Sequence, residues 1–173
     1  MDKDEPKDSI HRRWTETSFD GEPGHSPPIV PPHWHKHHDE YMEVVHGRVE
    51  FTLDGKSSIY MPENYTLFIP RLHVHSVRFL EGEAAMFTEK TDPPGDFKKD
   101  FFEDLLDDGY LSMLTAWRAF YNGDTYLALP GGLKILDQAV TLSLGYISAY
   151  LFPQKHKGML GESVQKQAVQ AKL

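Results

Sequence analysis

Apolar and polar residues alternate strictly from Val49 to Asp54, and this pattern constrains the fold more than any other feature of the chain. A period of two is that of a strand with one face in a core. Asp54-Gly55 comes directly at its end, and this dipeptide favours the tight turn of a β-hairpin. Short strands separated by turn residues indicate a mainly β chain, folded as a sandwich or barrel. The other strands are predicted at residues 41–46, 57–61, 66–69, 73–79 and 84–89.

Composition divides the 173 residues into four parts. Residues 1–28 are polar and rich in proline and glycine, so we expect a flexible arm with one strand near residues 14–19. Residues 29–90 contain the predicted strands and form the β core. Residues 91–152 change to helical spacing and are expected to pack on the core or on a partner. Residues 153–173 are a polar tail.

The last helix expected in the extension, residues 133–151, is apolar around nearly its whole circumference. Such a helix lies in a core, in a dimer interface, over a barrel mouth or on a lipid surface. Core or dimer packing is favoured, because the helix lacks the lysine- and arginine-rich face that is typical of lipid binding. Membrane-surface contact by residues 133–152 is the lesser alternative.

The bulk composition excludes several classes of function. The chain has 18 lysines and arginines against 26 acidic residues, a net charge of −8, which disfavours binding to nucleic acid. It has no cysteine, so a metal site would use nitrogen and oxygen ligands. We expect a cytoplasmic protein, since neither a secretory signal nor an apolar stretch long enough to span a bilayer is visible.

A cluster of histidines with a glutamate lies early in the predicted β core. His33 and His35 are two residues apart, so on a strand both imidazoles face the same side. Glu40 opens the next predicted strand, and Gly47 provides the turn that ends it. Two imidazoles and a carboxylate that converge on one point suit Fe(II), Mn(II), Ni(II) or Zn(II).

A fourth ligand is expected from residues 64–75. Pro70 ends a predicted edge strand. His73 and His75 then point to one face of the strand that follows.

These two segments resemble the two sequence motifs of the cupin superfamily. The first motif reads His-x-His, three or four residues, Glu, six residues, Gly, and it is matched at every specified position by His33, His35, Glu40 and Gly47. The second motif has Gly, Pro-x-Gly, His and Asn, where this chain has Asn64, Pro70, Leu72, His75 and Phe79. The ligand histidine is kept, and Asn64 tolerates the positive φ of the first glycine.

The resemblance covers residues 29–90 and implies a cupin jelly-roll β-barrel, here with an α-helical C-terminal extension. The helical remainder is similar to that of small fungal cupin-domain proteins from small-molecule pathways. The family implies one divalent metal ion inside the barrel, with Fe(II) favoured and Mn, Ni or Zn as alternatives. The implied ligands are His33, His35, Glu40 and His75.

An Fe(II) dioxygenase acting on a small hydrophobic, phenolic or enolic metabolite is the activity that the resemblance favours. The alternative is a Lewis-acid isomerase, cyclase, decarboxylase or dehydratase of secondary metabolism, with Glu40 or His73 as the catalytic residue that moves protons. A cupin that binds metal or ligand without turnover is the third possibility. Strand alternation predicts a substrate pocket lined by Met42, Val44, Phe51, Leu53, Val77 and Phe79.

Neighbouring polar residues are expected to play other roles. His37 and His38 are placed in a solvent-facing loop. Asp39 competes with Glu40 for the carboxylate role, and the motif spacing favours Glu40. His73 either lines the cavity as an acid or base or is a structural histidine. The exposed strand edges and the apolar last helix predict a homodimer.

Overall fold

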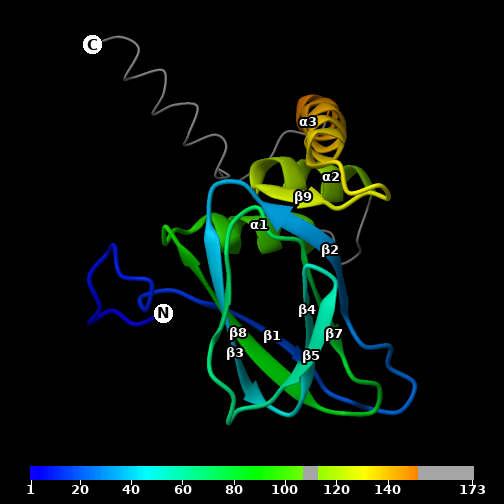
Figure 1. Cartoon of the computed structure of the whole chain (residues 1–173). Coiled ribbons are helices and arrows are strands. Elements are labelled where there is room, and N and C mark those ends of the chain that lie inside the picture. Colours follow the sequence, from blue (N-terminus) through cyan, green and yellow to red (C-terminus); the bar gives the residue numbers. More distant parts are fainter. Residues whose placement is uncertain (107–112, 152–173) are drawn as a thin grey trace. The chain divides into compact units, whose positions relative to one another are not determined.

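The computed structural model describes residues 1–106 and 113–151 of the chain (Figure 1). The chain divides into two units, residues 1–95 and 96–173. The polar tail predicted at residues 153–173 lies outside the described residues.

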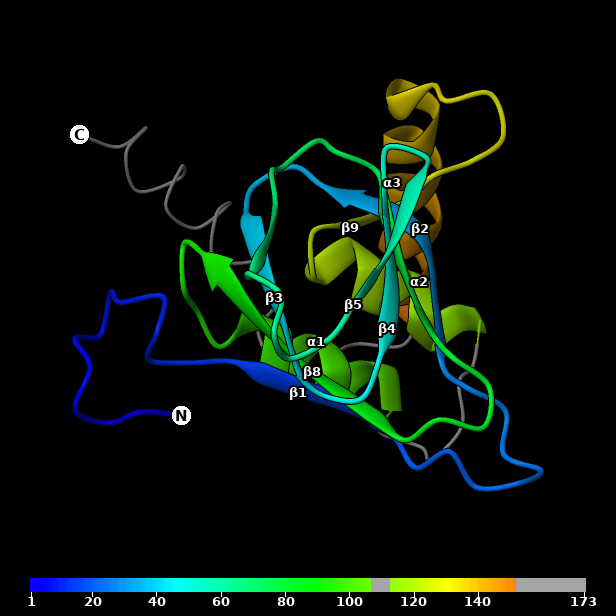
Figure 2. The same ribbon diagram turned by 60° about the horizontal axis from the view of Figure 1, so that its bottom comes forward.

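The first unit consists of two antiparallel sheets (Figure 1, Figure 2). One sheet has the order β1-β8-β3-β6, and within residues 1–95 the other has the order β5-β4-β7-β2. The predicted mainly β fold is confirmed, and it has the two-sheet form of a jelly roll. The strands are β1 Thr15–Phe19, β2 Ile29–His35, β3 Asp39–His46, β4 Val49–Leu53, β5 Lys56–Tyr60, β6 Leu67–Ile69, β7 His75–Phe79 and β8 Ala85–Asp92.

The hairpin predicted from Asp54-Gly55 joins β4 to β5. Asp54 has a φ of 48° and Gly55 a φ of 78°, and Leu53 lies opposite Lys56 across the turn. Two successive positive φ values are those of the tight hairpin turns that match the twist of a sheet. The prediction is confirmed.

One strand comes from the predicted N-terminal arm. β1 pairs along its whole length with β8, from Thr15 opposite Glu89 to Phe19 opposite Ala85. The side chain of Phe19 is buried in the core. Residues 15–19 are therefore part of the sheet.

Aromatic rings from both sheets meet in the core of the first unit. The ring centroid of Phe87 in β8 lies 5.5 Å from that of Phe51 in β4 and 5.7 Å from that of Phe79 in β7. The side chains that alternation predicted to line a substrate pocket point inward. Their use as a pocket stays a prediction. Five of them are buried and Leu53 is half-buried; the buried ones are Met42, Val44, Phe51, Val77 and Phe79.

The second unit contains α1 Phe97–Leu106, α2 Met113–Asn122, β9 Thr125–Leu127 and α3 Lys134–Leu151. A buried ion pair joins two of these helices, in which Nε of Arg118 donates a hydrogen bond of 3.0 Å to Oδ2 of Asp104. Among the described residues no helix is both long and apolar enough to cross a membrane.

α3 turns its small and polar residues, not its apolar ones, toward the interior of this unit. A side chain at Gly145 would overlap with Tyr121 of α2, so glycine allows the two helices to approach closely. The apolar residues predicted to pack in a core, such as Leu136 and Ile147, are exposed. These apolar residues of α3 therefore do not lie in the core of this unit. The buried residues of α3 are Asp137, Thr141, Gly145 and Ser148.

Candidate metal centre

Three histidines of the centre come from two neighbouring strands of one sheet. His33 and His35 lie on β2, and their two-residue spacing directs both imidazoles to the same side. β2 pairs with β7, and an irregularity between Val30 and His33 brings His33 opposite His75. The ring centroids of His33 and His75 are 4.1 Å apart. The strand pairing thus joins the histidines of the two predicted motifs.

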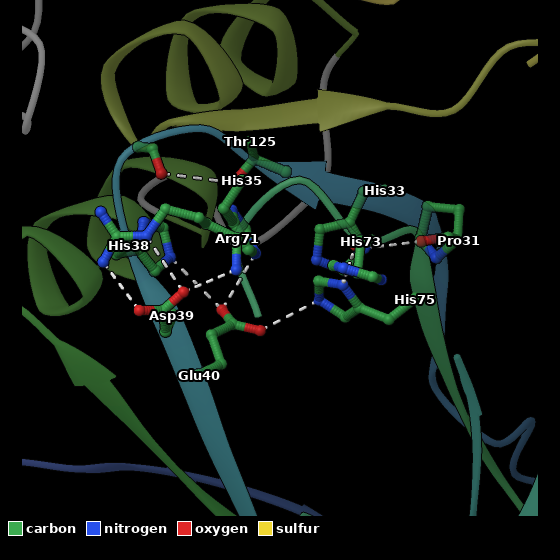
Figure 3. Close-up of polar contacts among 11 residues, drawn as sticks. Pro31, His33, His35, His38, Asp39, Glu40, Arg71, His73, His75 and Thr125 are labelled. Atoms are coloured by element: carbon green, nitrogen blue, oxygen red, sulfur yellow. Dashed lines mark hydrogen bonds and ion pairs between the residues drawn. The ribbon is translucent and has the colours of Figure 1, made fainter. Parts of the chain in front are cut away.

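The carboxylate comes from the other sheet. Glu40 lies on β3, and its side chain reaches the histidines in the interior (Figure 3). Its Oε1 is 2.9 Å from Nε2 of His35 and its Oε2 is 3.0 Å from Nε2 of His75. One potential ligand atom from each of the four residues lies within 4.8 Å of all the others. The structure therefore gathers all four predicted ligands, His33, His35, Glu40 and His75.

Two of the imidazoles are oriented by the backbone. Nδ1 of His33 lies 2.8 Å from the carbonyl oxygen of Pro31, and Nδ1 of His75 lies 3.1 Å from that of His73. A carbonyl oxygen only accepts, so each Nδ1 carries the proton and donates it. Nε2 of each ring then keeps its lone pair, as in metal sites whose histidines are held by an outer hydrogen bond.

Burial favours the neutral, metal-binding form of His33. Loss of solvent, followed by the nearby His75 and His35, lowers the pKa of His33 well below its ordinary value, while Glu40 acts in the opposite direction. All four side chains are almost inaccessible, the most exposed being His33 at 6%. A buried carboxylate needs a compensating charge. Three neutral nitrogen donors around one such carboxylate fit a divalent cation.

The turn before β7 keeps its shape although glycine is replaced. Leu72 has a φ of 67°, in the left-handed region that glycine favours. Its N–H donates a hydrogen bond of 2.7 Å to the carbonyl oxygen of His35. Asn64 tolerates positive φ, but it is not among the residues that adopt it. It forms its turn instead by accepting a hydrogen bond of 2.7 Å from the N–H of Met61 at Oδ1.

Asp39, the competing carboxylate, is held away from the cluster by Arg71. Oδ1 accepts hydrogen bonds of 2.6 Å from the backbone N–H and 3.0 Å from Nε of Arg71, and Oδ2 accepts one of 2.7 Å from Nη2 (Figure 3). These hydrogen bonds lower the pKa of Asp39 below its ordinary value. Glu40, and not Asp39, lies in the cluster with the histidines. Its role as a metal ligand stays a prediction.

His73 does not enter the cluster, and the prediction that it shares a strand face with His75 is wrong. β7 begins only at His75, after the left-handed turn at Leu72. The His73 side chain is 47% exposed, and its Nδ1 lies 2.6 Å from Oδ2 of Asp54. The ring is therefore held at the hairpin turn.

His38 was expected in a solvent-facing loop, and this prediction is also wrong. Its side chain is fully buried, and its Nε2 lies 3.4 Å from Oε1 of Glu40. Its ring centroid is 4.1 Å from that of His35. The two-residue spacing between His38 and Glu40 was the available signal, since it equals the spacing that aligns His33 with His35. His37 is exposed, as predicted.

The arrangement of the two motifs decides the fold. Two antiparallel sheets enclose an apolar core, and the ligand positions of both motifs meet between them. The fold is that of a cupin.

Comparison with known proteins finds solved structures, several of them described as cupins, that match about half of this chain. The Schizosaccharomyces pombe Cnp3 cupin domain is 13% identical, covering 50% of this chain and 58% of that domain, with a TM-score of 0.39. KdgF from Halomonas sp. is 24% identical over 48% of this chain and 69% of its own, with a TM-score of 0.37. An RmlC-like cupin from Shewanella frigidimarina is 16% identical over 50% of this chain and 68% of its own, with a TM-score of 0.40.

No protein-family model matches this cupin-fold chain, and neither does any curated protein. The chain spans less than two thirds of the Cnp3 cupin domain.

Proposed function

We propose that the chain binds one divalent metal ion through His33, His35, Glu40 and His75, and that this centre acts on a small organic metabolite. The observation that carries the proposal is the convergence of four buried donors from three strands within 4.8 Å of one another. A chance cluster of surface histidines would not include a buried glutamate from the opposite sheet.

The ligand set suits catalysis better than a purely structural role. Three neutral imidazoles and one carboxylate leave a divalent ion with a net charge of +1, and octahedral coordination leaves positions for a substrate or water. Bound Fe(II) would supply oxygen activation for a dioxygenase, which we favour, whereas Zn(II), Ni(II) or Mn(II) would supply Lewis acidity.

The chain's own residues define the kind of substrate. Val77 and Met42 lie two residues after the ligands His75 and Glu40 on the same strands, and they therefore face the same interior. Leu53 lies directly opposite His75 across β4 and β7. Apolar side chains thus adjoin the centre on both sheets and would exclude water from it. This lining supports a hydrophobic, phenolic or enolic compound whose oxygen atoms reach the metal.

Metal content and oxygen uptake together test this proposal. Protein stripped with a chelator is reloaded with Fe(II), Mn(II), Ni(II) or Zn(II), and bound metal is measured by elemental analysis. Each form is then incubated with a panel of phenolic and enolic compounds, with and without oxygen. We expect one ion per chain and oxygen consumption by the Fe(II) form, both lost in Glu40→Ala.

The other outcomes identify the alternatives. Turnover that continues without oxygen would favour an isomerase, cyclase, decarboxylase or dehydratase. Binding of a compound without any product would favour a cupin that only holds a ligand. Substoichiometric metal in the wild-type chain, equal to that in Glu40→Ala, would refute the metal centre itself.

A further inference from the structure

The side of α3 that points away from α2 is apolar and carries no charge. At about 100° per residue, ten residues of α3 fall on one half of its circumference. Nine of them are aliphatic or tyrosine, the tenth is Ser143, and none is ionised at neutral pH. Among them, Ile135 is 80% exposed and Tyr150 is 79% exposed. This outer face of α3 consists of Ile135, Leu136, Ala139, Val140, Ser143, Leu144, Tyr146, Ile147, Tyr150 and Leu151.

The polarity of the helix is the reverse of that of an ordinary surface helix. The residues of α3 that are buried in the unit, where the helix contacts α2 and β9, are Asp137, Thr141, Gly145 and Ser148. Oδ1 of Asp137 accepts a hydrogen bond of 2.9 Å from the N–H of Leu129, which accounts for that buried carboxylate. The polar face is thus already used within the unit, and the apolar face is the one that lacks a partner among the described residues.

The exposed apolar area is of the size of a protein interface. From the exposed fractions of its side chains, the outer face presents on the order of 700 Å² of apolar surface. The largest apolar patch on a typical monomer is about 300–600 Å². A standard interface buries about 800 Å² on each partner. The outer face alone therefore comes close to what one side of a stable dimer needs.

The charge distribution favours a second copy of the chain over a lipid surface. Helices that lie on membranes combine an apolar face with a polar face rich in lysine and arginine. In α3 the polar face is buried and Lys134 is its only basic residue. The chain as a whole has a net charge of −8, so two copies repel each other over most of their surface. The uncharged outer face is a place where that repulsion is weakest.

We propose that the outer face of α3 packs against the same face of a second copy, related to it by a two-fold axis. An isologous contact of this kind needs a self-complementary surface, and an uncharged apolar helix face satisfies this condition. Ser143 lies near the middle of α3 on this face, so the two copies of Ser143 meet where the helices cross. The proposal is independent of the metal centre.

Oligomeric state under a charge substitution tests the contact. Sedimentation velocity of the full chain is expected to show twice the monomer mass of 19.8 kDa. Ile147→Glu places a charge in the contact and is expected to raise the dissociation constant at least 100-fold. Ile29→Glu is the matched control, because Ile29 is 67% exposed but lies on β2 in the first unit. Circular dichroism and melting curves confirm that both variants fold.

Cross-linking at Ser143 gives a second, independent readout. The chain contains no cysteine, so Ser143→Cys introduces one unique thiol. A short bis-maleimide is expected to convert this variant to a covalent dimer, whereas Ile29→Cys is not cross-linked under the same conditions.

Several outcomes would overturn the proposal. A wild-type chain that is monomeric at all concentrations, or a dimer that survives Ile147→Glu, would show that this face is not the contact. Flotation of the wild-type chain with neutral phosphatidylcholine vesicles, abolished by Ile147→Glu, would assign the face to lipid instead.

Discussion

Replacing His38 by alanine is expected to weaken metal binding without abolishing it. Nε2 of His38 lies 3.4 Å from Oε1 of Glu40, and the ring packs against His35. His38 therefore touches two of the four candidate ligands while it lies outside the group formed by them. Its removal frees the Glu40 carboxylate and the His35 ring to move. Metal affinity then falls because these two side chains are less well oriented.

The size of the effect follows from that distance. Removal of a group that holds a metal ligand typically costs about 10- to 100-fold in affinity. The separation of 3.4 Å between Nε2 and Oε1 is longer than that of a strong hydrogen bond. We therefore expect a loss near the lower end of that range, about tenfold or ~1.4 kcal/mol.

Calorimetric titration of the metal-free protein with Zn(II), in the presence of a competing chelator, measures this change. His37→Ala is the matched control, because His37 is exposed and one residue away. It should bind like the wild-type chain. His38→Gln keeps a hydrogen-bond donor at the site and should recover part of the lost affinity. His75→Ala should lose stoichiometric binding altogether, which calibrates the effect of removing a ligand.

Two results would refute this reasoning. Wild-type affinity in His38→Ala would show that the contact with Glu40 has no influence on the centre. A loss as complete as that in His75→Ala, without recovery in His38→Gln, would show that His38 is itself a ligand.

Three further substitutions test the packing within each of the two units. Phe79→Ala, at a side chain that is 1% exposed, should lower the free energy of unfolding of the first unit by about 3–5 kcal/mol in urea titrations. Gly47→Ala should lower the melting temperature more than Gly24→Ala, because both have positive φ but only at Gly47 would the new Cβ overlap with the backbone; equal effects would contradict this. Asp104→Ala leaves the buried Arg118 without its carboxylate and should lower the free energy of unfolding of the second unit by about 3–5 kcal/mol. Thermal unfolding measures this change, and an unchanged stability would show that the ion pair is dispensable.

The fold of the first unit could be predicted because its signals are local. The alternation from Val49 and the turn residues Asp54-Gly55 depend only on neighbours in the chain, and both predictions hold in β4, β5 and their turn. The ligand spacing is also local, because His33 and His35 need only a strand to face the same side.

The environment of the centre could not be predicted in the same way. His38 and His73 stand in similar sequence surroundings, each two residues before a ligand, yet one is buried against Glu40 and the other is bound to Asp54 at the surface. The difference arises because β3 follows closely on His38 while a left-handed residue, Leu72, precedes His73 and delays the start of β7. Leu72 holds this left-handed conformation while its N–H donates a hydrogen bond to His35 of β2, a residue far away in the chain. The local sequence does not reveal such a contact.

The sequence by itself determined the strand period, the hairpin turn and the choice of four candidate ligands, because these follow from spacing along the backbone. Only the tertiary structure decided which histidines surround the ligands and which side of α3 is buried. Those outcomes depend on contacts between distant segments, because the apolar content of α3 alone favours burial of its apolar face, whereas its small and polar residues are the ones that turn inward. Gly145 contributes to this outcome, since it allows a close approach of α2 that a larger side chain would prevent.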